Sequence, residues 1–261
     1  MVVFFDFDGT IVDQETQIIP QSTIDAIHAL RLNGHIPVLN TGRPSGHVDP
    51  RALALDFAGM VCSCGMEVFL EGKTLLQVQP SPDVCRKVRQ LTRECGMQVL
   101  YEAADRLLLD GQYSTCKPCL EEIATMRGKG VPPIAECDQV AEPLFIKLVS
   151  HDAPGCDKER YLREMAEDFE VIIRGETFVE YVCKGYSKAT GMDLLLAHLG
   201  LTRQDSFAIG DSTNDLTMFA AAGTTIALGG CSEALKPHAD YITDTVLGDG
   251  IAKALRHYGL I

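Results

Sequence analysis

Strand signals alternate with helix signals at both ends of this 261-residue chain, and the strand signals are short, almost continuous apolar runs. Strands are predicted at Val2–Phe5, Ile36–Leu39, Ala58–Cys62, Phe207–Ile209 and Thr224–Leu228. Such runs, which lack alternation of apolar and polar residues, are typical of parallel strands that are covered on both faces. We therefore predict an α/β fold with a doubly wound parallel sheet, to which both ends of the chain contribute.

Helix boundary signals flank these runs. Ser22–Asp25 has the pattern of an N-terminal capping box, and the apolar stripe that follows it stops at Gly34. Near the other end, one predicted helix stops at Gly200, and a second, Asp215–Ala222, stops at Gly223.

The middle of the chain has a different organisation, in which helices and short strands follow one another as in an α+β segment. Helices are predicted at Pro82–Cys95, Tyr113–Met126 and Asp157–Asp168, and strands at Met97–Tyr101, Leu107–Asp110, Leu144–Ser150, Glu170–Ile173 and Phe178–Cys183. The expected domains are therefore a core made of residues 1–80 and 186–261, and an inserted α+β cap made of residues 81–185.

Composition excludes several classes of protein. No stretch approaches the roughly 20 apolar residues of a membrane span. Asp6 and Asp8 interrupt the apolar run at the N-terminus, so it is not a signal peptide, and a cytoplasmic location is expected. Nothing in the sequence indicates a partner chain, which leaves a monomer or a weak homo-oligomer.

The formal net charge of −13 argues against a nucleic-acid or anionic-membrane partner, because both bind basic patches. An anionic substrate would need strong local positive charge. A bound dication and one well-placed lysine would supply it.

The ten cysteines are too sparse for a disulfide scaffold and are expected to be free thiols. Cys116 and Cys119 have the spacing of a redox or zinc pair, to which Cys137 could add a third thiolate. A single pair of this spacing is weak evidence, so free thiols are the preferred interpretation.

Two pairs of acidic residues lie at strand ends. Asp6 and Asp8 follow the first strand, and their spacing places both carboxylates on one side of an extended segment. Like charges held that close need a cation or a shared proton. Asp211 and Asp215 follow a later apolar run and add the oxygen ligands that a hard cation prefers.

Two further groups belong to the same edge of the predicted sheet, where ligands bind in doubly wound folds. Thr41 follows the strand Ile36–Leu39, and Lys188 stands just before a predicted helix. A metal, two carboxylates, a hydroxyl and an ammonium group are what phosphoryl transfer uses.

Four motifs, in this order, resemble those of the haloacid dehalogenase superfamily, and most of all its Cof-type phosphatases. They are Asp6-Phe7-Asp8-Gly9-Thr10, Thr41-Gly42-Arg43, Lys188 and Gly210-Asp211-Ser212-Thr213-Asn214-Asp215. More than half of the chain separates the second motif from the third, which resembles the subgroup with a large cap at that point.

The resemblance implies a role for each carboxylate. Asp6 would attack phosphorus and become an aspartyl phosphate, while Asp8 would protonate the leaving oxygen and then activate water. Mg²⁺ would be held by Asp6, the backbone carbonyl of Asp8, and Asp211, with Asp215 a direct or water-mediated ligand.

The resemblance also implies a phosphate-binding set. Thr41, Gly42 and Lys188 would bind the phosphoryl oxygens, with Asn214 hydrogen-bonding nearby. Two positions depart from the family pattern: Cys64 precedes Gly65 where many relatives carry Asn, and Gly230 stands where many carry Asn.

Several residues outside the motifs carry weaker expectations. Tyr181 and Arg174 are candidates for touching substrate from the cap, with ordinary strand packing and a surface turn as the alternatives. His47, His151 and His198 show no metal-ligand spacing and are expected on solvated faces.

The function expected from the motifs is Mg²⁺-dependent hydrolysis of a small phosphorylated metabolite, with a sugar phosphate as the preferred class. A hexose phosphomutase of the phosphomannomutase type is the alternative, because it carries a similar cap. A phospho-aspartate signalling domain is less favoured, because receiver domains are shorter and have no cap.

Overall fold

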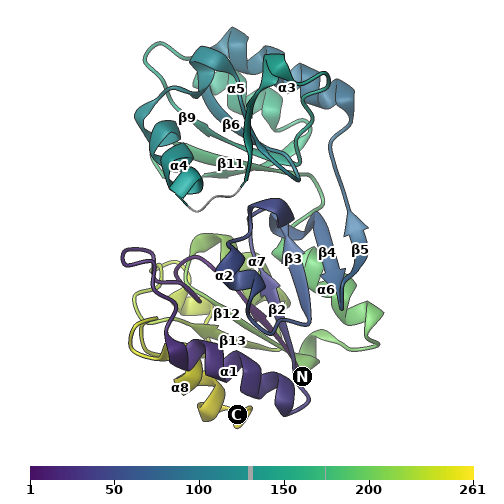
Figure 1. The fold of residues 1–261 in the computed structure, drawn as a ribbon, viewed down its shortest axis with the longest axis vertical. Helices are drawn as coiled ribbons and strands as arrows, with labels where there is room; N and C mark the ends of the chain where they lie inside the picture. Colours follow the sequence, from purple (N-terminus) through teal and green to yellow (C-terminus); the bar gives the residue numbers. More distant parts are fainter. Residues whose placement is uncertain (129–131, 174) are drawn as a thin grey trace. The chain divides into compact units, whose positions relative to one another are not determined.

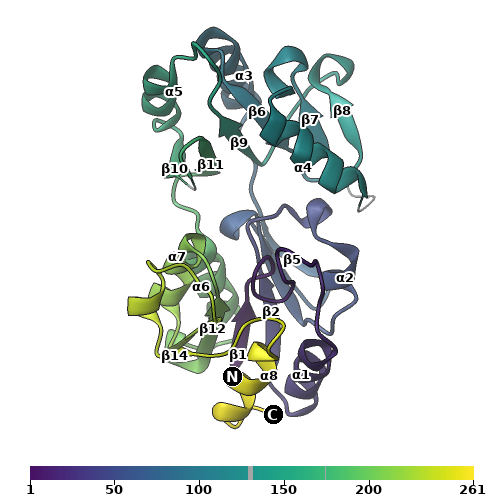
Figure 2. The ribbon, with the colours of Figure 1, turned by 90° about the vertical axis from the view of Figure 1, so that its left-hand side faces the viewer.

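The computed structural model describes residues 1–128, 132–173 and 175–261. The chain forms two compact units, which Figures 1 and 2 show from two sides. The first unit contains residues 1–42, 50–77 and 186–261, and the second contains residues 43–49 and 78–185.

One sheet organises the first unit. Its strands, in spatial order, are β14 (Tyr241–Ile242), β13 (Thr224–Ala227), β12 (Ser206–Gly210), β1 (Val2–Phe5), β2 (Ile36–Asn40), β3 (Gly59–Cys62), β4 (Glu67–Leu70) and β5 (Lys73–Gln77). The pairs from β14 to β3 are parallel, whereas β4 and β5 extend the sheet in antiparallel fashion. The α/β sheet is confirmed. Its antiparallel extension by β4 and β5 was not predicted, because β4 has an apolar run of only three residues and β5 has only two leucines among polar residues.

Helices cover both faces of this sheet (Figure 2). They are α1 (Gln21–Leu32), α2 (Pro50–Leu53), α6 (Lys188–His198), α7 (Leu216–Ala221) and α8 (Gly250–His257). Val2 and Phe4 of β1 pack in one core with residues of α6 and α7, while α1 packs against α8 on the other face. Within the described residues, no helix combines the length and the hydropathy that crossing a membrane requires.

The predicted capping box at Ser22–Asp25 is wrong. α1 begins at Gln21, with Pro20 in the N-cap position and no side-chain cap hydrogen bond. With the extended Pro20 at the N-cap, the helix starts two residues earlier than a cap at Ser22 would place it, and Ser22 lies in the first turn, where its hydroxyl donates to Asp249.

The second unit is built on a six-stranded sheet. In spatial order its strands are β10 (Phe169–Ile173), β11 (Phe178–Cys183), β9 (Lys147–His151), β6 (Gln98–Glu102), β7 (Leu107–Leu109) and β8 (Ile134–Glu136). α3 (Pro82–Cys95) and α5 (Lys158–Met165) pack on one face, and α4 (Lys117–Gly128) packs on the other. Alternate residues serve the two faces: Tyr101 and Leu148 pack against α3 and α5, whereas Leu100 and Val149 pack against α4.

α4 begins four residues later than the predicted Tyr113. The backbone amides that precede it are bound by a side chain of the sheet. The amides of Thr115 and Cys116 donate to Gln98 Oε1 at 2.7 and 2.8 Å. The Ser114 hydroxyl donates to the Val99 carbonyl. These bonds hold the segment against β6 and delay the helix until Lys117.

Residues 43–49 group with the second unit, although the sequence prediction included them in the core. His47 Nε2 lies 2.8 Å from the Ala103 carbonyl oxygen and 3.2 Å from that of Arg106. A Cβ on Gly46 would lie 2.0 Å from the Ala104 carbonyl oxygen, so only glycine permits this approach. The expectation that His47 lies on a solvated face is therefore wrong, since its side chain is buried.

Candidate active site

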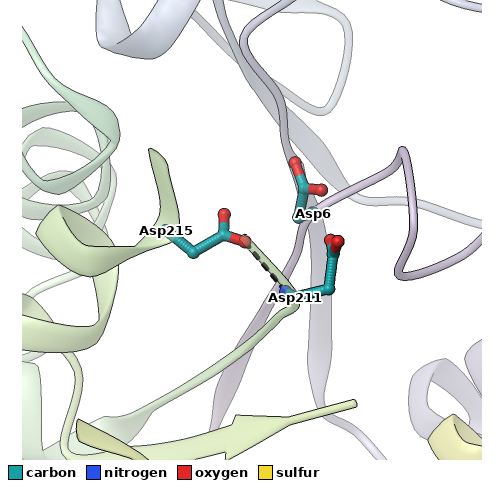
Figure 3. Close-up of side chains that lie close together, drawn as sticks. All are labelled: Asp6, Asp211 and Asp215. Atoms are coloured by element: carbon teal, nitrogen blue, oxygen red, sulfur yellow. Dashed lines mark hydrogen bonds between the residues drawn. The ribbon is translucent and has the colours of Figure 1, made fainter. Parts of the chain in front are cut away.

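Three carboxylates converge at the carboxyl end of the first unit's sheet, as Figure 3 shows. Asp6 follows β1, Asp211 follows the adjacent parallel strand β12, and Asp215 ends a 3-10 turn before α7. One oxygen from each carboxylate lies within 4.8 Å of the other two. Parallel neighbours end at the same edge of a sheet, which brings together residues that are far apart in the sequence.

Lys188 joins two of these carboxylates. It is the first residue of α6, its side chain is 1% exposed, and its Nζ donates to Asp6 Oδ1 and to Asp215 Oδ1, each at 2.6 Å. A capping box formed by Ser187 and Thr190 begins the helix at this position. The predicted motif lysine therefore lies against the predicted nucleophile.

Asp215 is bound on both of its oxygens. Its Oδ2 accepts the amides of Asp211 and Ser212 at 2.9 and 3.0 Å, while Lys188 holds Oδ1. A Cβ on Gly210 would lie 2.5 Å from Asp215 Oδ2, so glycine is required at that point. In this arrangement Asp215 organises the loop that presents Asp211.

The first motif holds Asp211 from the opposite side. Thr10 Oγ1 donates to Asp211 Oδ1 at 3.0 Å. Gly9 has φ of +88°, and a Cβ there would lie 2.4 Å from Asp211 Oδ2. The sequence had indicated Thr10 only as part of a motif, and its bond to Asp211 gives it an orienting role.

Asp8 is partly exposed, and its carboxylate is not in the three-carboxylate group. Its backbone carbonyl, which the resemblance implies as a metal ligand, accepts Gln14 Nε2 at 3.3 Å. Sequence reasoning missed Gln14, because a glutamine in a loop carries no recognisable signal.

Thr41 is buried at the end of β2, where its amide donates to the Val61 carbonyl and its carbonyl accepts the Cys64 amide. The turn of Ser63, Cys64 and Gly65 that follows β3 has three successive positive φ angles, of 50°, 52° and 93°. A Cβ on Gly65 would lie 2.1 Å from the Ser187 carbonyl oxygen. This turn thus lies directly against the start of α6 and helps to position Lys188.

The remaining predicted positions lie around these loops. Asn214 is partly buried and its Oδ1 accepts the Ser212 hydroxyl at 2.8 Å, while Gly42 directly follows Thr41. Gly230 has φ of +87°, and a Cβ added there would meet no atom within 4 Å. Asn tolerates that left-handed conformation better than most residues, so the backbone at this position would accept either residue.

Electrostatics explain why the site favours a cation. Burial raises the pKa of Asp6 well above its usual range, with Asp215 and Asp211 adding to the effect and Lys188 opposing it. Burial and Asp215 raise the pKa of Asp211 to about 6. Burial opposes the charge of Lys188, but the carboxylates of Asp215 and Asp6 outweigh it and raise the pKa of this lysine.

One ammonium group therefore leaves the three carboxylates short of positive charge. The donors are all oxygens, which suits a hard dication such as Mg²⁺ and not a soft metal. The residues fit the metal that the motifs predict.

The weaker candidates have different outcomes. Tyr181 is fully buried, bonded to Ser150 Oγ at 2.9 Å and packed edge-on against Tyr161, so strand packing accounts for it. His151 is also buried, contrary to expectation. Arg174 lies outside the described residues.

Comparisons with known proteins agree with this geometry. A family model described as haloacid dehalogenase-like hydrolase matches residues 3–255. The chain is 26% identical over 260 residues to YkrA of Bacillus subtilis (strain 168), covering 100% of this chain and 98% of YkrA. It is 26% identical over 262 residues to 5-amino-6-(5-phospho-D-ribitylamino)uracil phosphatase YcsE of the same organism, covering 99% and 96%. Its structure resembles BT1666 from Bacteroides thetaiotaomicron, studied among phosphatases of the HAD superfamily, with TM-score 0.83, 29% identity and coverage of 100% and 95%.

Proposed function

Because this chain belongs to the haloacid dehalogenase-like hydrolase family and is a phosphatase of small phosphorylated compounds, we propose that it hydrolyses a sugar phosphate with Mg²⁺ and through an aspartyl phosphate. The observation that carries the proposal is the contact of Lys188 Nζ with Asp6 Oδ1, at 2.6 Å, beside Asp211. This contact places an ammonium group beside a carboxylate at the ligand-binding edge of the sheet.

In the proposed first step, an Asp6 oxygen forms a bond to phosphorus as the bond from phosphorus to the ester oxygen breaks. Asp8 gives its proton to that oxygen, so the leaving group departs as an alcohol. Lys188, Thr41 and Gly42 would bind phosphoryl oxygens, with Asn214 nearby, and would meet the developing charge with preformed donors.

In the second step, Asp8 takes a proton from water as the water oxygen attacks phosphorus. The bond from phosphorus to Asp6 breaks, which releases inorganic phosphate and restores both carboxyl groups to their starting states. The two steps use the same pair of residues in opposite proton-transfer directions.

Asp6, Asp211 and the Asp8 carbonyl would hold Mg²⁺, with Asp215 acting directly or through water. When bound, the metal supplies positive charge against the phosphoryl oxygens. Burial raises the pKa of Asp6, so added positive charge beside this carboxylate also favours its ionised, nucleophilic form.

In the proposed scheme the core carries out the reaction, and the cap selects the substrate. We assign residues 81–185, together with residues 43–49 that pack with them, as the cap that contacts the leaving group and selects it. The relative YcsE is named for a phosphate ester on a ribityl chain, which carries several hydroxyl groups as a sugar does.

The experiment that tests the proposal measures phosphate release from a panel of phosphorylated metabolites. Asp6→Asn should abolish release, because an amide is a poor nucleophile, while Asp25→Asn on the exposed face of α1 should leave it unchanged. If Asp6→Asn kept the parent rate on the best substrate, the aspartyl-phosphate mechanism would be wrong. Isomerised sugar phosphate without released phosphate would instead favour the hexose phosphomutase.

A further inference from the structure

A pair of cysteines in the second unit lies at the start of α4, away from the carboxylate site in the sequence and in another unit. Cys116 is half-buried and immediately precedes the helix, whereas Cys119 is fully buried in the core beneath it. Pro118 stands at the second helical position, where its missing N–H removes no helical hydrogen bond.

Cys116 acts as the N-cap of this helix. The Leu120 amide donates to its carbonyl, and the Cys119 amide donates to its Sγ at 3.4 Å. Serine and threonine oxygens normally accept this bond. A sulfur atom that accepts an amide at a helix N-terminus lies where negative charge is stabilised.

The spacing permits a disulfide within one helical turn. Residues three apart at a helix start have Cα atoms about 5 Å from each other, inside the usual range for a disulfide. The two thiols already interact: burial raises the pKa of Cys119, and its hydrogen bond with Cys116 raises it further. The half-buried sulfur is thus the accessible one, and the buried sulfur lies behind it.

A second observation on the same sheet face is a buried histidine without a hydrogen-bond partner in the part of the chain that the structure describes. His151 is 7% exposed, and neither ring nitrogen has a hydrogen-bond partner among the described residues. It lies opposite Gln98 in β6, whose side chain binds the Cys116 amide, and it stacks on Phe178, which packs with Cys116 against the Cys119 core. Both nitrogens are buried, so an amide group of a bound molecule could bond to this imidazole only after the side chains that cover it move.

We propose that Cys116 and Cys119 form a thiol–disulfide exchange site that reacts with small peptide-like disulfides. Cys116 Sγ, as thiolate, attacks one sulfur of the disulfide, whose S–S bond breaks, and the departing thiolate takes a proton from water. Cys119 then loses its proton to water and attacks Cys116 Sγ, and the second thiol leaves in the same way. Two protein thiols are oxidised, and one disulfide is reduced to two thiols.

A metal site is the other use of this spacing, and the structure disfavours it. Among residues 1–128, 132–173 and 175–261, the one group of three or more potential ligands is that of Asp6, Asp211 and Asp215. Cys137, the third thiolate that the sequence offered, does not join the pair in such a group. Two sulfur ligands alone do not complete the four-coordinate site of zinc.

The test uses the full chain and glutathione disulfide as the probe, with thiols blocked by iodoacetamide before tryptic digestion and mass spectrometry. The bond between Lys117 and Pro118 resists trypsin, so both cysteines stay on one peptide, which should lose two hydrogen atoms on oxidation. Cys119→Ser should instead retain glutathione on Cys116. Cys116→Ser keeps an N-cap acceptor, and it should form neither the disulfide within the pair nor a mixed disulfide with glutathione.

Cys156 is the matched control, because it is half-buried and outside the pair. In the reduced protein, Cys116 should be alkylated about tenfold faster than Cys156, and Cys156→Ser should leave the exchange unchanged. Equal rates at the two positions, or an oxidised protein in which both pair cysteines still take up iodoacetamide, would overturn the proposal. Stoichiometric zinc binding that protects both thiols would also overturn it. None of these readouts depends on phosphatase activity.

Discussion

Lys188 Nζ lies 2.6 Å from Asp6 Oδ1, although 182 positions separate the two residues in the sequence. Lys188 makes an equal contact with Asp215, and all three side chains are almost completely buried. This contact joins the first strand of the sheet to a helix that follows the inserted unit. The stability of the site and its chemistry therefore depend on the same ammonium group.

Replacing Lys188 by Met should impair both properties. Removing one partner of a buried ion pair typically destabilises a protein by about 3–5 kcal/mol, because the other charge stays buried. Loss of a phosphoryl-binding donor should lower kcat by roughly 10²–10³. Urea unfolding and phosphate release measure the two effects. Lys253→Met, which removes an exposed ion pair with Asp244, should change neither, and equal effects of the two variants would contradict this account.

Gly65→Ala should displace the start of α6. The new Cβ would collide with the Ser187 carbonyl, and a misplacement of about 1 Å near the reacting groups typically lowers the rate about 10²-fold. Gly34→Ala is the matched control, because Gly34 also has a positive φ but nothing lies within 4 Å of its Cβ position. Steady-state kinetics of both variants separate the collision from backbone strain. Similar rate losses in both would remove the packing explanation.

Asp8→Asn should separate substrates by the basicity of their leaving groups. Without the proton donor, a sugar alkoxide leaves poorly, whereas an aryl oxide departs almost unaided. The second step also loses its general base, which typically contributes 10²–10⁴-fold. With an aryl phosphate, stopped-flow absorbance should show a burst of one product per enzyme and then slow turnover. The assignment of Asp8 as acid and base fails if both substrate types slow equally without a burst.

Activity should vanish with a chelator and return with Mg²⁺ but not with Ca²⁺. Ca²⁺ accepts more ligands in looser geometry, so both oxygens of Asp6 could bind it and the nucleophile would be lost.

Thr10→Val should raise the Mg²⁺ concentration for half-maximal activity about tenfold, because Asp211 Oδ1 loses the hydroxyl that orients it. Titration of activity with Mg²⁺ measures this shift. Thr16→Val, in the same loop but bonded to Asp13, should leave the titration unchanged.

Stability should fall as the pH rises through the titration of Glu122 in α4. Burial, helped by Glu102 and Glu180 and opposed by Lys147 and Arg43, raises its pKa from 4.5 to about 7. Because the folded-state pKa is the higher one, the unfolded chain ionises first, and this group lowers stability progressively from pH 4.5 to pH 7. The full shift corresponds to at most about 3 kcal/mol.

Glu122→Gln should remove that loss, so the variant should be more stable than the parent at about pH 8 and similar to it near pH 4.5. Urea unfolding across this range measures the difference. Glu121→Gln, at the exposed neighbouring position, should follow the parent curve. If the unfolding free energies of the parent and of Glu122→Gln differed by the same amount at every pH, Glu122 would not titrate in this window.

The sequence was sufficient for the parts of the fold that local pattern controls. Largely apolar runs indicated β1, β2, β3, β12 and β13, because strands covered on both faces bury side chains on both sides. It did not indicate β5, in which only Leu75 and Leu76 are apolar and pack against the core, while the strand pairs with β4. It also misplaced the start of α4, because side chains on another strand bind the amides in front of that helix.

For the site, the sequence by itself determined which residues are available and the reaction type that they favour. Asp6, Asp211 and Lys188 were recognisable because each stands at a strand end or helix start with a characteristic neighbourhood. Only the tertiary structure decided that Asp215 is bound on both oxygens and that Thr10 orients Asp211. It likewise decided that His47 and His151 are buried. The physical reason is that hydrogen bonding and burial depend on atoms brought close by long-range contacts, which no local pattern encodes.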